Sequence, residues 1–264
     1  MDLKLNDKLA FVTGSTAGIG LAIARTLCAE GARVIVNGRT PQRVADAVAS
    51  IHDENPSAKL DEFAADLSTA EAAAAAIRAF DRVDILVNNL GIYEPKPFEE
   101  ITDADWYKAI EANFMSGVRL SRHYLPKMKS AGWGRIIFIS SESAVNIPAE
   151  MIQYGVTKTM QVALARGLAE TTVGTAVTVN SILAGPTRSE GVNEFVTRMA
   201  KGKGVSTADV EREFFRGIRP SSLLQRFATT DEVAVMVAFI ASPLSSATNG
   251  AAVRVEGGVV RSIL

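Results

Sequence analysis

The stretch Thr13-Gly14-Ser15-Thr16-Ala17-Gly18-Ile19-Gly20 decides how this chain folds. It follows a short apolar run at 9–13 and opens a periodic apolar pattern at 19–30, which predicts a strand, a glycine-rich turn and a helix. Glycines allow a sharp bend and a close approach of the backbone to a phosphate, which free N–H groups at the helix start can hold. A tight structural turn is the plain alternative, but this position between strand and helix favours a dinucleotide site.

The same alternation of strand and helix continues to the end of the chain. Short β-branched runs predict strands at 9–13, 33–37, 60–64, 84–88, 135–140, 177–183 and 252–255. Longer alanine-rich patterns predict helices at 19–30, 42–54, 69–80, 102–130, 151–172 and 231–241. Parallel strands need crossover connections, and strands that are apolar nearly throughout indicate helices on both faces. The sequence therefore predicts a doubly wound, seven-stranded parallel sheet of the Rossmann type in a three-layer α/β/α fold.

Length and composition agree with one globular domain over 1–264. A hydrophobic fraction of 47% with 22% charged residues excludes disordered and collagen-like chains. The 28 basic and 29 acidic residues give a net charge of -1, which does not favour nucleic acid as a partner. The longest apolar stretch, 233–241, is far shorter than the roughly 20 residues of a membrane span. The single cysteine, Cys28, excludes an internal disulfide, so we expect a cytoplasmic protein without a membrane partner.

One segment interrupts the regular alternation. Residues 187–227 form a long connection between the sixth strand and the next regular helix, with short helical pieces and several glycines. Insertions of this length in a compact domain are more often lids or binding loops than tethers. We therefore expect a substrate-binding lid here.

The end of the second strand bears on which dinucleotide is bound. An acidic side chain at this place would accept hydrogen bonds from the adenosine ribose, but the sequence has Asn37-Gly38-Arg39. The guanidinium of Arg39 can pair with a 2′-phosphate, which favours NADP(H) over NAD(H). The alternative is that Arg39 is an ordinary solvated arginine.

The pattern Tyr154-Gly155-Val156-Thr157-Lys158 places a phenol and an ammonium four residues apart on one face of a predicted helix. A nearby ammonium favours the phenolate, so we expect Lys158 to lower the pKa of Tyr154. Ser141 lies thirteen residues upstream at the carboxyl end of a predicted strand, where doubly wound sheets bind their ligands. These three residues are the candidate catalytic group.

Further motifs follow one another along the chain: Asp66-Leu67 after the third strand, Asn88-Asn89-Leu90-Gly91 after the fourth, and Asn113 in the long helix. With the glycine turn, Ser141, Tyr154 and Lys158, they resemble the classical short-chain dehydrogenase/reductase family and its 3-oxoacyl-[acyl-carrier-protein] reductases. The resemblance covers almost the whole chain. It departs at Leu90, where the family has a small residue, and at Ala184, where proline is usual; both changes should alter packing near the cofactor.

The resemblance implies a role for each motif residue. Ser141 would donate a hydrogen bond to the substrate oxygen, and Tyr154 would act as general acid or base. Lys158 would orient the nicotinamide ribose, and Asn113 would hold a water that links Lys158 to solvent. The residues expected to bind the cofactor are Gly14, Ser15, Thr16, Gly18, Ile19, Gly20, Arg39, Asp66, Leu67, Asn89, Gly91, Tyr154, Lys158, Gly185 and Thr187.

The leading hypothesis is an NADP(H)-dependent enzyme that interconverts a medium-sized, largely apolar ketone and a secondary alcohol. One alternative is a 3-oxoacyl-[acyl-carrier-protein] reductase, whose acidic carrier could dock on Arg119, Arg122, Lys127 and Lys129. The other is a non-catalytic dinucleotide sensor, although such a protein would be expected to lose the catalytic residues. The resemblance also implies a homotetramer. His52 and His123 have no second ligand at zinc spacing, so no metal site is expected.

Overall fold

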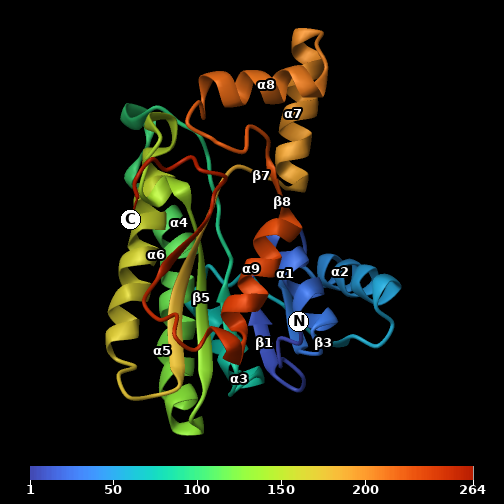
Figure 1. The fold of residues 1–264 in the computed structure, drawn as a ribbon, viewed down its shortest axis with the longest axis vertical. Coiled ribbons are helices and arrows are strands. Elements are labelled where there is room, and N and C mark those ends of the chain that lie inside the picture. Colours follow the sequence, from blue (N-terminus) through green and yellow to red (C-terminus); the bar gives the residue numbers. More distant parts are fainter. Residues whose placement is uncertain (264) are drawn as a thin grey trace.

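A computed structural model describes residues 1–263 of the chain. Its centre is a seven-stranded sheet with the order β3-β2-β1-β4-β5-β6-β9 (Figure 1). All neighbouring pairs are parallel. The strands are β1 (Leu9–Val12), β2 (Arg33–Gly38), β3 (Lys59–Ala64), β4 (Ile85–Asn88), β5 (Gly134–Ser141), β6 (Val177–Ala184) and β9 (Ala252–Val255). The predicted doubly wound sheet is confirmed, with every strand end within one residue of its expected place.

Helices cover both faces of the sheet, as the buried central strands require. On one face, α1 (Gly18–Ala29), α2 (Pro41–Glu54) and α9 (Thr230–Ala241) build one core cluster. On the other, α3 (Ala70–Ala79), α5 (Ser116–Ala131) and α6 (Ile152–Glu170) build a second. Figure 1 shows α1 and α9 on one side of the strands and α5 and α6 on the opposite side. These layers hold the strand ends, and thus the site, rigidly in place.

The helix expected at 102–130 is present but is not uniform. It consists of α4 (Asp103–Ile110), a π-helical segment at Glu111–Met115, and α5. A π-helical segment shifts the hydrogen-bonding pattern by one residue and is often found at functional sites. Asn113 lies in its middle, so the irregular turn coincides with the residue singled out by its motif.

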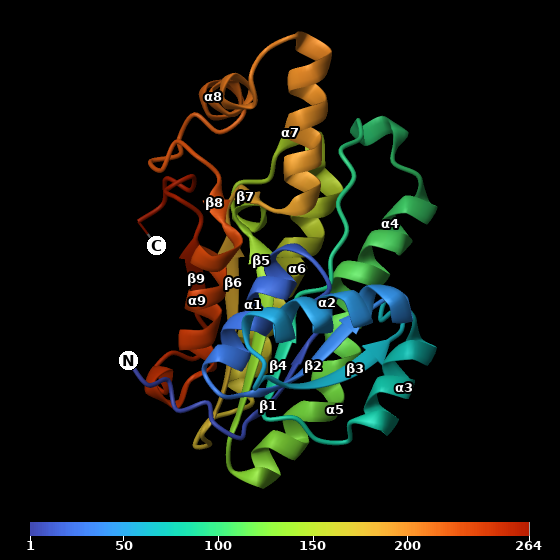
Figure 2. The same cartoon turned by 90° about the vertical axis from the view of Figure 1, so that its right-hand side faces the viewer.

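The segment expected to be a lid has its own small structure. The two helices α7 (Glu190–Lys203) and α8 (Thr207–Gly217) stand beyond the carboxyl edge of the sheet (Figure 2). They share a separate apolar cluster centred on Phe215 and Phe227. A two-stranded sheet of β7 (Thr187–Arg188) and β8 (Ala228–Thr229), which was not predicted, closes the base of this insert. Residues 187–227 are called the insert below.

The surroundings of Cys28 and the length of the helices bear on two further expectations. Cys28 is buried in α1, and burial raises the pKa of its thiol to about 12, which fits its expected part as a small hydrophobic side chain. Among the described residues, no helix is long and apolar enough to cross a membrane.

Candidate active site

The glycine-rich turn lies where the strand order of the sheet reverses. β1 has β2 on one side and β4 on the other, so the turn after β1 and the loop after β4 meet at the carboxyl edge. Crevices of this kind are where open α/β sheets bind ligands. The amide of Asn89 joins the two segments, because its Nδ2 donates to the carbonyl oxygens of Thr13 at 2.9 Å and Gly14 at 3.0 Å. Asn89 therefore holds the turn in shape.

A second asparagine supports the turn from β2. Asn37 is buried; its Oδ1 accepts from the Gly14 N–H at 3.0 Å, and its Nδ2 donates to the carbonyls of Phe63 and Ala65. An aspartate could not make the last two bonds, which explains the missing carboxylate at this place. Ser15 is also buried, with its hydroxyl donating to the Val12 carbonyl and accepting from the Asn37 N–H. Ser15 thus shapes the turn from within.

The start of α1 suits an anion. In the part of the chain that the structure describes, Ala17 at its N-cap makes no side-chain hydrogen bond and its first turn holds no acidic residue. Side chains cap α2, α3, α4, α7, α8 and α9 instead. Gly18 adopts a φ of +55°, in the left-handed region that favours glycine. Uncapped N–H groups and a bare backbone fit the pyrophosphate of a dinucleotide.

The remaining expected cofactor residues surround this turn. Thr16 rests on Gly38 at the end of β2, and Arg39 is exposed beside it. Asp66 is exposed and accepts from the Ser68 N–H at 3.1 Å, whereas Leu67 is buried in the second core cluster. Gly91, Gly185 and Thr187 lie further along the carboxyl edge. A Cβ on Gly91 would lie 3.3 Å from Lys158 Nζ, the backbone of Gly185 packs against Glu256, and Thr187 Oγ1 donates to the Gly185 carbonyl at 2.9 Å.

Gly20 has no room for a side chain. A methyl group there would lie 2.4 Å from both Asn89 Nδ2 and the Gly14 carbonyl oxygen. We expect Gly20→Ala to push Asn89 off the turn, lower the melting temperature by roughly 2 to 10 °C and weaken dinucleotide binding. Gly167→Ala is the matched control, because it lies in α6 with nothing within 4 Å and should stabilise the helix slightly. Equal melting temperatures for both variants would contradict the packing argument.

The candidate catalytic residues meet at the carboxyl end of β5. Ser141 ends this strand, and Tyr154 and Lys158 lie on the first turns of α6, which packs against it. Lys158 Nζ lies 5.5 Å from the Tyr154 ring centroid. It donates to the Ile139 carbonyl at 2.7 Å and to Gln161 Oε1 at 3.3 Å. A serine, a phenol and a buried ammonium thus share one edge with the glycine turn.

A family model described as short chain dehydrogenase matches residues 8–200. The chain belongs to the short-chain dehydrogenase family. It is 46% identical over 263 residues to the uncharacterized oxidoreductase YvaG of Bacillus subtilis, which covers 100% of both chains. It is 34% identical to the D-beta-hydroxybutyrate dehydrogenase of Cupriavidus necator over 97% of this chain and 99% of that one. A solved structure of L-sorbose reductase from Gluconobacter frateurii, complexed with NADPH and L-sorbose, superposes with a TM-score of 0.92 at 28% identity over 100% of both chains.

Family membership makes the protein an oxidoreductase that acts on alcohol or ketone groups with NAD(P). The geometry corrects one expectation about its short-chain dehydrogenase site. The sequence predicts that Lys158 lowers the pKa of Tyr154, but burial raises this pKa, and the nearby Ser141 hydroxyl offsets the rise only in part. Burial also lowers the pKa of Lys158, to about 7, so its charge is itself disfavoured. The expectation is wrong for this structure because burial disfavours the charged forms of both groups, and the nearby Glu142 carboxylate raises the pKa of Tyr154 further.

Asn113 is tied to the site through protein atoms. Its side chain exchanges hydrogen bonds with the backbone of Ile92, with Oδ1 accepting at 2.7 Å and Nδ2 donating at 2.9 Å, and Nδ2 also donates to Thr157 Oγ1. Its carbonyl oxygen accepts from the side-chain amide of Gln161, which in turn accepts from Lys158. Gln161 is buried and was not singled out from the sequence. It joins Lys158 to Asn113 along the path where the resemblance implies a water.

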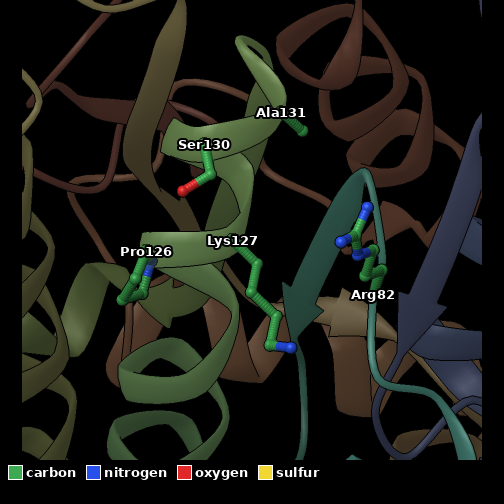
Figure 3. Close-up of a pocket in the computed structure, with 5 residues that line it drawn as sticks. All are labelled: Arg82, Pro126, Lys127, Ser130 and Ala131. Atoms are coloured by element: carbon green, nitrogen blue, oxygen red, sulfur yellow. The ribbon is translucent and has the colours of Figure 1, made fainter.

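Other surface features of this short-chain dehydrogenase lie away from the site. A cavity of about 250 Å³ between Arg82 and the end of α5 is lined by Lys127, Ser130 and Ala131 (Figure 3). These residues precede β4 and β5, so the cavity lies at the amino ends of the strands, opposite Ser141. Within residues 1–263, no group of three His, Cys, Asp or Glu side chains could hold a metal ion.

Proposed function

We propose that this protein is an NADP(H)-dependent oxidoreductase that interconverts a ketone and a secondary alcohol, with Tyr154 as general acid and base. The observation that carries the proposal is the meeting of Ser141, Tyr154 and Lys158 beside an uncapped helix start at one edge of the sheet. The bound nicotinamide supplies or accepts the hydride. The protein contributes position, a proton and an electrostatic field.

Each catalytic side chain has a task that its surroundings allow. Tyr154 is half-buried and protonated at neutral pH, because burial raises its pKa, so it can deliver a proton to a ketone oxygen. The Ser141 hydroxyl is close enough to Tyr154 to offset part of the effect of burial on the pKa of the phenol, so one substrate oxygen can reach both hydroxyls. Lys158 lies one helical turn after Tyr154 on α6. Its Nζ lies close to Gly91, which fits a part for Lys158 in binding the ribose.

Arg39 supports the choice of NADP(H). It directly follows β2 beside Thr16, is exposed, and forms no ion pair with any residue in 1–263. Its guanidinium is thus available to a phosphate at the end of β2. The NADPH in the complex with L-sorbose reductase agrees with this preference.

Replacing Arg39 by alanine tests the cofactor preference. We expect NADPH binding to weaken about 10- to 100-fold while NADH binding stays unchanged, because one charge-assisted contact is worth roughly 1.5–3 kcal/mol. Fluorescence titration of both cofactors measures this directly. Arg78→Ala, an exposed arginine in the last turn of α3, is the matched control. Tighter binding of NADH than NADPH by the wild type would overturn the assignment of Arg39.

A panel of ketones and acyl thioesters separates the enzyme hypotheses. The basic residues of α5 give little support to carrier-protein docking, because they are largely engaged within the chain. Arg119 pairs with Glu111, Lys127 pairs with Asp81, and Lys129 donates to the Thr171 carbonyl. Turnover of simple ketones in preference to thioesters is therefore the expected result. Cofactor binding without any turnover would favour the sensor alternative. A homotetramer, a cytoplasmic location and the part of the insert as a lid stay predictions.

A further inference from the structure

Glu142, the residue after Ser141, carries a buried carboxylate that the reaction as proposed does not use. It is only 3% exposed. Its Oε2 accepts from Ser141 Oγ at 2.7 Å and also from the hydroxyl of Ser143. The Ser141 oxygen in turn accepts from the Ser143 N–H at 3.1 Å. The hydroxyl that is to meet the substrate is therefore held by its neighbour.

The counter-ion of Glu142 comes from the insert. Arg219 Nε donates to Glu142 Oε1 at 2.8 Å, across 77 residues of sequence, and Arg219 is itself 9% exposed. Its Nη1 reaches Glu150 at 3.4 Å and the Ile218 carbonyl at 3.0 Å. The Arg219 N–H bonds the Phe214 carbonyl at the end of α8. Arg219 thus fastens the aromatic cluster of the insert to the floor of the site.

A buried ion pair is stable only when hydrogen bonds satisfy both of its charged groups. Loss of one partner leaves the other charge buried and unpaired, which lowers the free energy of unfolding by several kcal/mol. If the insert moved away with Arg219, Glu142 would lose its counter-ion. The carboxylate would then turn toward solvent, and this change would release its hold on Ser141. The position of the insert and the orientation of the Ser141 hydroxyl are therefore one linked arrangement.

We infer that Glu142 and Arg219 are positioning residues, which act through Ser141 and make its orientation depend on closure of the insert. The inference rests on the proposed part of Ser141 in catalysis. With the pair formed, Ser141 Oγ is fixed by two hydrogen bonds, because it donates to Glu142 Oε2 and accepts from the Ser143 N–H. A ketone oxygen competes with Glu142 for the one Ser141 hydrogen, so the donor oxygen is already in place and only this hydrogen has to turn toward the substrate.

The test is a double-mutant cycle between Arg219 and Ser141. Arg219→Met alone should lower kcat about 10- to 100-fold, less than the roughly 10²- to 10³-fold loss for a removed oxyanion donor, while the cofactor Kd from fluorescence titration stays unchanged. In a Ser141→Ala background the same change should lower kcat less than about twofold, because the residue through which it acts is gone. Glu150→Gln, on the exposed carboxylate that touches only the other side of Arg219, is the matched control. Equal losses in both backgrounds would overturn the inference.

A second measurement needs no turnover, so it separates this inference from the proposed function. Trypsin should cut after Lys201 and Lys203, which are exposed in α7, several times faster in Arg219→Met than in Glu150→Gln. Equal rates would show that Arg219 does not fasten the insert. If Arg219→Met does not fold, Arg219→Lys replaces it in the double-mutant cycle, because lysine keeps the positive charge but lacks the planar set of guanidinium donors. If the wild type reduces no ketone, the proposed function fails, and the digestion still tests the link.

Discussion

Turnover falls about 10²- to 10⁴-fold when Tyr154 is replaced by phenylalanine, if the phenol carries the proton. The aromatic ring remains, including its edge-to-face contact with Tyr93 at 6.1 Å between ring centroids, so folding and cofactor binding should be preserved. Steady-state kinetics with the best ketone of the panel measures the loss, and fluorescence titration with NADPH measures binding.

The direction of the pKa shift adds a second expectation for the same residue. Burial raises the pKa of Tyr154, so the phenol is protonated through the neutral range. Ketone reduction, which needs the acid, should therefore be active at neutral pH, whereas alcohol oxidation, which needs the phenolate, should rise with pH. Tyr107→Phe removes an exposed phenol on α4 and should change neither profile. Wild-type turnover in Tyr154→Phe would assign the proton to another group.

The parts of the site that the sequence predicts are those with local signals. Five of the seven strands are buried over almost their whole length, and all seven begin and end within a residue of the positions that the sequence predicts. Tyr154 and Lys158 share a helix face by spacing alone. Gln161 lies on the next turn from Lys158 and could have been found in the same way, as a polar residue on a buried face.

The parts that could not be predicted depend on contacts distant in sequence. The pair of Glu142 and Arg219 joins residues 77 positions apart, and each alone has the appearance of a solvated charge. The strands β7 and β8 have two residues each, too few for any alternation to show. The expected lowering of the Tyr154 pKa failed for a related reason, because spacing places two charges together but does not report how deeply the fold buries them.

Lys158→Met should remove activity and yet stabilise the protein at neutral pH. Burial lowers the pKa of Lys158 from 10.5 to about 7, so the unfolded chain binds more protons than the folded one between these values. Stability therefore rises with pH through this window, and below pH 7 the full penalty applies, on the order of 5 kcal/mol. Methionine has a similar length and no charge, so it escapes the penalty, although it leaves the Ile139 carbonyl without this donor.

The measurement is urea unfolding of the cofactor-free wild type and variant at several pH values from 6 to 10. The difference between the two curves is the useful quantity, because other groups such as Cys28, whose pKa burial raises to about 12, change stability equally in both proteins. The advantage of Lys158→Met should be greatest at pH 6 to 7 and shrink toward pH 10. Lys108→Met, on the exposed face of α4, should change the free energy of unfolding by the same small amount at every pH. A variant that is less stable at every pH would show that the hydrogen bonds of Lys158 outweigh the burial of its charge. If the variant instead loses activity and gains stability, Lys158 is a residue that lowers the stability of the fold but is needed for catalysis.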